Sequence, residues 1–64
     1  MSKLKDMRTM RGITQQQLSD ATGISVRMIQ QYEQGKNNFN TAAAITVYKI
    51  AKALYCKVED IIDV

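Results

Sequence analysis

The positions of the three glycines constrain the fold of this 64-residue chain more than any other feature of its sequence. Gly12, Gly23 and Gly35 each follow a segment with helical periodicity, and a new segment begins a few residues after each. Glycine adopts the left-handed conformation in which many helices end at little cost. No segment alternates polar and apolar residues as a strand does. The sequence therefore predicts short helices joined by tight connections.

Hydroxyl side chains mark the starts of two of these helices. Thr14 is a favoured N-cap, and Gln17 three residues later completes a capping box, whereas Ser25 is the next N-cap. We expect a first helix that carries Leu4, Met7 and Arg11 on one face and ends at Gly12, a second from Gln15 to about Thr22, and a third that runs to about Gln34 with Ile29 and Tyr32 facing inward.

The second half of the chain predicts two further helices after a polar loop over residues 36–40. The expected elements are a helix from about Ala42 to Leu54 with Val47, Ile50, Ala51 and Leu54 buried, a break at Tyr55 and Cys56, and a short helix from Val58 that gives Ile61 and Ile62 to the core. We predict an all-α, compact five-helix bundle that forms a single domain over residues 1–64. The four methionines and Cys56 are expected to fill its core, and packing is the simpler role for Tyr48 and Tyr55.

Composition argues against several classes of protein. A chain of this size has one small core. Its single cysteine, Cys56, excludes an internal disulfide, and the absence of histidine removes the commonest metal ligand and the usual general base. It also has no glycine-rich phosphate cradle and no cluster of metal ligands, so we expect no enzymatic activity, no cofactor, no metal and no small-molecule ligand. No segment resembles a signal peptide or a membrane span, so a cytoplasmic protein is expected.

The net charge of +3 is unevenly distributed. Residues 1–40 contain six Lys and Arg and three Asp and Glu, which is six minus three, or +3, whereas residues 41–64 contain three of each and sum to zero. The excess of positive charge in the first two thirds of the chain is compatible with a polyanionic partner there, although a charge of this size is weak support.

The second and third predicted helices have the spacing of a helix-turn-helix over residues 14–34. Only Gly23 and Ile24 separate Thr22 from the Ser25 cap, and so tight a turn makes the two helix axes cross steeply. Such a crossing needs a small residue, a turn glycine and an aliphatic residue, which Ser19, Gly23 and Ile29 supply at offsets of four and six.

Four segments together resemble the phage repressor and Cro type of helix-turn-helix domain, the XRE family. They are Arg11-Gly-Ile-Thr-Gln-Gln-Gln-Leu-Ser-Asp-Ala-Thr-Gly-Ile-Ser, Tyr32-Glu-Gln-Gly-Lys, Ile50-Ala-Lys-Ala-Leu and Val58-Glu-Asp-Ile-Ile, which span almost the whole chain in the family's order and spacing. The resemblance implies a five-helix bundle whose third helix lies in the major groove of DNA.

The resemblance also assigns roles to residues. It implies base contacts from Val26, Arg27 and Gln31, with Gln30 close by. Helix geometry separately places a polar face opposite Ile29 and Tyr32, made of Arg27, Gln30, Gln31 and Gln34. Arg27 would pair with guanine, Gln31 with adenine, and Val26 would pack on a thymine methyl group. Phosphate contacts are expected from Gln15, Gln34, Lys36, Asn37 and Asn38. The resemblance assigns Arg8 and Glu33 to a partly buried structural ion pair.

The function that follows is sequence-specific binding of a double-stranded operator by a small transcriptional regulator, expected to be a repressor. A weak homodimer through residues 55–64 would place two copies on half-sites about 34 Å apart. Two alternatives stay open: an antitoxin that binds DNA and also a toxin protein, and a protein-interaction module with this fold and no DNA binding. Tyr55 departs from the family pattern, because relatives commonly have glycine there, and a left-handed cap at this position would be strained or absent.

Overall fold

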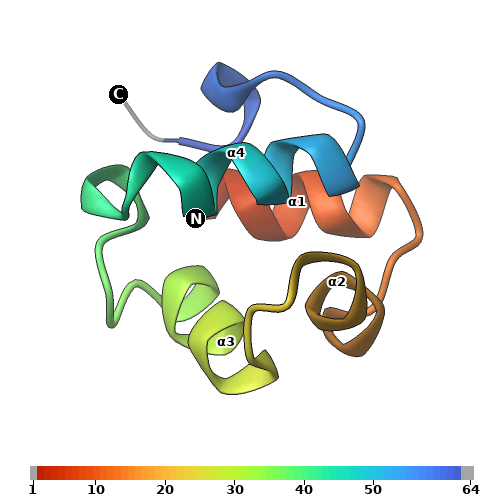
Figure 1. Ribbon diagram of the computed structural model, residues 1–64, viewed down its shortest axis with the longest axis horizontal. Coiled ribbons are helices and arrows are strands. Elements are labelled where there is room, and N and C mark those ends of the chain that lie inside the picture. Colours follow the sequence, from red (N-terminus) through yellow and green to blue (C-terminus); the bar gives the residue numbers. More distant parts are fainter. Residues whose placement is uncertain (1, 63–64) are drawn as a thin grey trace.

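Four α-helices and two 3₁₀ turns follow one another over residues 2–62, the part of the chain that the computed structural model describes (Figure 1). The elements are α1 (Lys3–Met10), α2 (Gln15–Thr22), α3 (Val26–Gln34), the turn η1 (Phe39–Thr41), α4 (Ala44–Ala53) and the turn η2 (Val58–Asp60). Over these residues there is no strand, so the predicted all-α class is confirmed. The predicted fifth α-helix is wrong, because only the turn η2 forms in its place.

The predicted boundaries of α2 and α3 are confirmed, because local side-chain bonds fix them. The Thr14 hydroxyl accepts a bond from the Gln17 N–H at 3.0 Å, and Gln17 Oε1 accepts one from the Thr14 N–H at 2.9 Å. The Ser25 hydroxyl accepts from the Met28 N–H at 3.1 Å. Ser2 is an N-cap that is not predicted from the sequence: it caps α1 in the same way, accepting from the Lys5 N–H.

The chain between α3 and α4, for which a loop is predicted, contains a short 3₁₀ element. The Asn38 side chain accepts a bond from the Asn40 N–H at 3.0 Å and starts η1, whose Phe39 is buried against the Tyr32 ring with centroids 4.9 Å apart. Burial of an aromatic ring is strongly stabilising, so this segment becomes ordered although the residues around Phe39 are polar. As a result α4 begins at Ala44, two residues later than predicted.

A single 3₁₀ turn replaces the expected last helix. Asp60 accepts a bond from the Lys57 N–H through its carboxylate at 2.9 Å, and the Ile61 N–H donates to the Val58 carbonyl at 3.1 Å. This turn brings Ile61 into the core at 1% exposure and leaves Ile62 half-buried. One turn is enough to bury this side chain.

Tyr55 ends α4 in the left-handed conformation that is usual for glycine, with φ of 53°. The Cys56 N–H donates to the Ala51 carbonyl and the Tyr55 N–H to the Lys52 carbonyl, which is the Schellman arrangement. Arg11 stabilises this end of α4, because its Nε donates to the Leu54 carbonyl at 2.8 Å and its Nη2 to the Tyr55 carbonyl at 3.1 Å. The strained cap is therefore present rather than absent.

The core lies between the two helix pairs. In Figure 1, α2 and α3 occupy one side of the molecule and α1 and α4 the other; α2 packs on both α3 and α4, and α1 packs on α3 and η2. The fully buried side chains are Leu4, Leu18, Ile29, Ile50, Leu54 and Ile61. Thr22 is also buried, and its hydroxyl donates to the Leu18 carbonyl and accepts from the Ile24 N–H, which holds the tight turn between α2 and α3.

Several side chains assigned to the core lie on the surface. Met10 is 71% exposed and Met28 is 37% exposed, so the prediction that they fill the core is wrong. Met7 packs against the core as predicted. Tyr48 and Tyr55 are 53% and 82% exposed, so packing is not their role either. Cys56 is half-buried against the core as expected. Met1 lies outside the described residues.

Among residues 2–62, no helix is long and apolar enough to cross a membrane.

Candidate nucleic-acid interface

Helix α3 has one apolar face toward the core and one polar face toward solvent. Ile29 is completely buried, and Tyr32 packs against the core beside it. Of the residues predicted to face away, Arg27, Gln30 and Gln34 are exposed and Gln31 is half-buried. Val26, the other predicted base contact, is also half-buried. The structure thus brings the predicted base-contacting residues together on one helix.

A hollow of about 600 Å³ lies beside this face, between the N-terminal end of α2 and α3. It is lined by Lys5, Arg8, Thr14, Gln15, Gln16, Val26, Glu33 and Gln34. Lys5 is an exposed cation at this hollow that the sequence analysis did not single out. The signal that could have found it is its position three residues before Arg8, which places both residues on one face of α1.

Arg8 and Glu33 form an ion pair under this hollow. Arg8 Nε and Nη2 donate to the two carboxylate oxygens of Glu33 at 2.7 and 3.1 Å, and Nη1 donates to the Ile13 carbonyl at 2.9 Å. The side chains are only 14% and 3% exposed, respectively. The hydrogen bonds to Glu33 raise the pKa of Arg8, and desolvation opposes that shift only in part. The pair joins α1 to α3.

Gln15 extends this network from the core to the surface. Its Nε2 donates to Glu33 Oε1 at 3.0 Å, and its Oε1 accepts a bond from Gln30 Nε2 at 3.3 Å. A carboxylate paired with an arginine only accepts hydrogen bonds, so the orientation of the Gln15 amide is determined by chemistry. Gln15 therefore uses both ends of its side-chain amide within the protein.

The loop after α3 makes similar internal contacts. Asn37 Nδ2 donates to Gln31 Oε1 at 2.7 Å and approaches the Met28 sulfur at 3.3 Å, while the Asn37 N–H donates to the Gln31 carbonyl. Asn38 caps η1, as described above, and Lys36 is exposed. Of the three loop residues predicted to contact phosphate, only Lys36 makes no side-chain bond to another described residue.

Arg27 differs from its neighbours on α3. It is exposed, and its guanidinium bonds to none of residues 2–62. All five of its N–H donors are therefore available to a partner.

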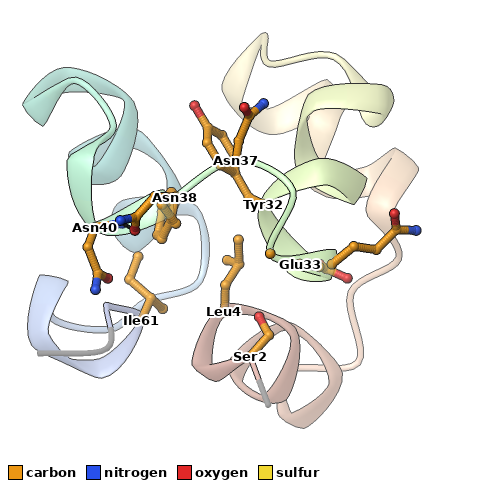
Figure 2. Close-up of a pocket in the computed structure, with 11 residues that line it drawn as sticks. Ser2, Leu4, Tyr32, Glu33, Asn37, Asn38, Asn40 and Ile61 are labelled. Atoms are coloured by element: carbon orange, nitrogen blue, oxygen red, sulfur yellow. Dashed lines mark hydrogen bonds between the residues drawn. The ribbon is translucent and has the colours of Figure 1, made fainter.

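A second groove of about 370 Å³ lies between α1, the loop after α3 and the C-terminal turn (Figure 2). Leu4, Tyr32 and Ile61 converge on it from three elements, and Asn37, Asn38 and Asn40 lie along the loop. Its lining residues include acidic Glu33 and, among the described residues, no lysine or arginine. This groove is therefore not suited to bind a phosphate.

Within the described part of the chain, no group of three or more His, Cys, Asp and Glu side chains is close enough together to hold a metal ion. A protein-family model described as helix-turn-helix matches residues 4–61. A comparison with curated proteins gave no match. The match covers both 3₁₀ turns and all four helices except Lys3, the first residue of α1. It includes every residue described above on the polar face of α3.

Proposed function

Because this chain belongs to the helix-turn-helix family of the XRE type, a family of DNA-binding regulators, we propose that it is a small transcriptional repressor that reads an operator with α3. The observation that carries the proposal is the polar face of α3, on which Arg27 is exposed and unpaired among the described residues. A guanidinium in this state can donate two parallel bonds to guanine O6 and N7, the commonest specific contact in the major groove.

Phosphate contacts would fix the position of α3 on the duplex. The exposed cations Lys5 and Lys36 lie on α1 and just after α3, so together they could contact the backbone on two sides of the groove. Gln15 would contribute the free backbone N–H at the start of α2 rather than its side chain, which is already bonded. Exposed Gln34 is a further candidate.

The proposed mechanism is non-covalent. Two copies would occupy half-sites about 34 Å apart and block or recruit other proteins at a promoter. The dimer contact is proposed at the C-terminal end, where Tyr55 is 82% exposed and Val58 37%. Asp63 and Val64, which complete that predicted surface, lie outside the described residues.

Selection of bound sites from random duplexes, followed by titration of the selected site, tests this function. We expect Arg27→Ala to weaken binding to the selected site by about 1–3 kcal/mol and to leave binding to random duplexes nearly unchanged. Lys49→Ala is a matched control, because Lys49 is an exposed cation on α4, away from the proposed interface. Equal losses on both duplexes would make Arg27 a phosphate contact.

One observation favours the alternative of a protein-binding module or antitoxin. Ile45 and Tyr48 expose 59% and 53% of their surface on α4, and Tyr55 is exposed beyond its end. Exposed apolar and aromatic side chains are typical of protein interfaces. Affinity for DNA that rises steeply as salt is lowered supports the regulator, whereas no binding to any duplex at low salt would favour the protein-binding module.

A further inference from the structure

The base preference of a glutamine is not determined by the residue type alone, because its side-chain amide has a donor end and an acceptor end of similar size. Which bases it prefers depends on which end faces the groove. Two adjacent glutamines, Gln30 and Gln31, lie on the polar face of α3, and each is bonded to a second amide of the protein. These partners decide which end each glutamine presents.

The orientation of Gln30 follows from the ion pair below it. Glu33 accepts, so Gln15 turns its Nε2 inward and its Oε1 outward. Gln15 Oε1 can only accept, so Gln30 must approach it with Nε2, as the 3.3 Å contact shows. The oxygen of Gln30, on the other side of its planar amide, is left for the base.

The orientation of Gln31 is the opposite. Its Oε1 accepts from Asn37 Nδ2 at 2.7 Å, and the same Nδ2 lies 3.3 Å from the Met28 sulfur, which can only accept. The bond from the Asn37 backbone N–H to the Gln31 carbonyl holds the loop against α3. The two N–H groups of Gln31 Nε2 bond to no other described residue. Gln31 is therefore left with donors to offer.

We propose that Gln15 and Asn37 are positioning residues that fix opposite hydrogen-bonding directions for Gln30 and Gln31. The proposal rests on DNA binding by α3. Gln30 then prefers a base with an exocyclic amino group in the major groove, adenine or cytosine. Gln31 prefers a base whose major-groove edge only accepts, guanine or thymine, and of the two purines it prefers guanine, which offers O6 and N7. This revises the pairing with adenine that is predicted for Gln31 from the chemistry of its side chain.

The test begins with the selected operator. The base pair that Gln31 contacts is identified with Gln31→Ala: it is the position at which this variant no longer distinguishes between duplexes that differ in one base pair. Competition binding then gives the ratio of affinities for guanine and adenine at that position. The wild-type protein should prefer guanine, by about tenfold, and Asn37→Ala should bring the ratio close to one.

Asn37→Asp is the sharper variant. A carboxylate cannot donate, so Gln31 must present Nε2 to it and turn its oxygen toward the base, which should invert the preference from guanine to adenine. The added negative charge lowers affinity for every duplex alike and cancels in the ratio. A wild-type preference for adenine, or an unchanged ratio in Asn37→Ala, would overturn the assignment.

Gln15→Ala tests the other half, since it frees Gln30 and leaves the ion pair in place. Preference for adenine or cytosine at the base read by Gln30 should be lost, whereas Gln16→Ala, an exposed neighbour bonded to Asp20, should leave it unchanged. Unchanged discrimination in Gln15→Ala would contradict this half.

Nuclear Overhauser contacts in the free protein separate the positioning from the DNA binding. The side-chain amide protons of Asn37 should contact the γ-methylene protons of Gln31, and those of Gln30 should contact Gln15. Contacts without any duplex binding would mean that the proposed function fails while the positioning stands. Absence of the contacts would overturn the positioning itself.

Discussion

The ion pair between Arg8 and Glu33 should be the most sensitive point of the fold. Arg8→Met keeps most of the side-chain volume but removes two of the three hydrogen bonds to Glu33, leaving only that from Gln15. The Glu33 side chain is 3% exposed, so its carboxylate would be left buried without a counter-charge. Breaking a buried pair by removing one partner costs about 3–5 kcal/mol, and we take about 3 because Arg8 is 14% exposed.

That loss is large for a chain of this size. At about 0.05–0.15 kcal/mol per residue, 64 residues give a free energy of unfolding of roughly 3–10 kcal/mol, so the variant loses between a third of its stability and all of it. In a small domain a loss of about 3 kcal/mol lowers the Tm by at least about 12 °C. Urea and thermal unfolding, followed by far-UV circular dichroism, measure both quantities.

Two further variants separate the lost pair from lost packing. Lys5→Met makes the same kind of change at an exposed position of α1 and should cost little. Arg8→Met combined with Glu33→Leu removes both charges and should be more stable than Arg8→Met alone. If the two single losses simply add in the double variant, the carboxylate is not destabilised by isolation and the reasoning is refuted.

The pair should also be insensitive to pH near neutrality. The pKa of Arg8 is raised in the folded protein, so its stabilising effect is complete below the pKa of the unfolded chain and is lost only as pH rises through the folded value. Both lie far above neutral. The coupling measured between Arg8 and Glu33 should therefore be the same at pH 7 and pH 9.

Three other predictions concern single side chains. Tyr55→Gly should raise the free energy of unfolding by about 0.5–1 kcal/mol. It relieves a left-handed strain of about 1–2 kcal/mol, and the greater conformational entropy of glycine in the unfolded chain offsets part of that gain. A lower free energy of unfolding in urea would show instead that the exposed ring stabilises the fold. Thr14→Ala should cost about 1 kcal/mol in the same assay, since it removes one half of the capping box, and no change would mean that the cap is not formed in solution. Burial raises the pKa of the Cys56 thiol, so alkylation at pH 7.5 should be slower in the folded than in the urea-unfolded protein and should accelerate as pH rises; equal rates would contradict the burial.

Features determined by neighbouring residues could be predicted from the sequence. The capping hydroxyls of Thr14 and Ser25 act on backbone groups within three residues, and the left-handed glycines end the same segments that their positions indicate. The polar and apolar faces of α3 also follow from periodicity alone. These local rules were sufficient to place the helix-turn-helix.

Features determined by distant contacts could not be predicted in this way. Phe39 reads as one aromatic residue in a polar loop, and only its packing on Tyr32 makes η1 a structural element. Asn37 lies where a phosphate contact is expected, yet its side chain bonds to Gln31, because the loop folds back on α3. Tyr55 keeps a glycine conformation because Arg11, 44 residues away in sequence, holds its carbonyl.

The isolation of Arg27 has a consequence for how such a protein could acquire a new target. A substitution at Gln30 or Gln31 also changes the bonds to Gln15 or Asn37, so a new base preference there alters contacts within the protein as well. A substitution at Arg27 alters no bond among residues 2–62. Duplicated copies of this gene could therefore diverge in target most readily through position 27, with the rest of the reading face retained.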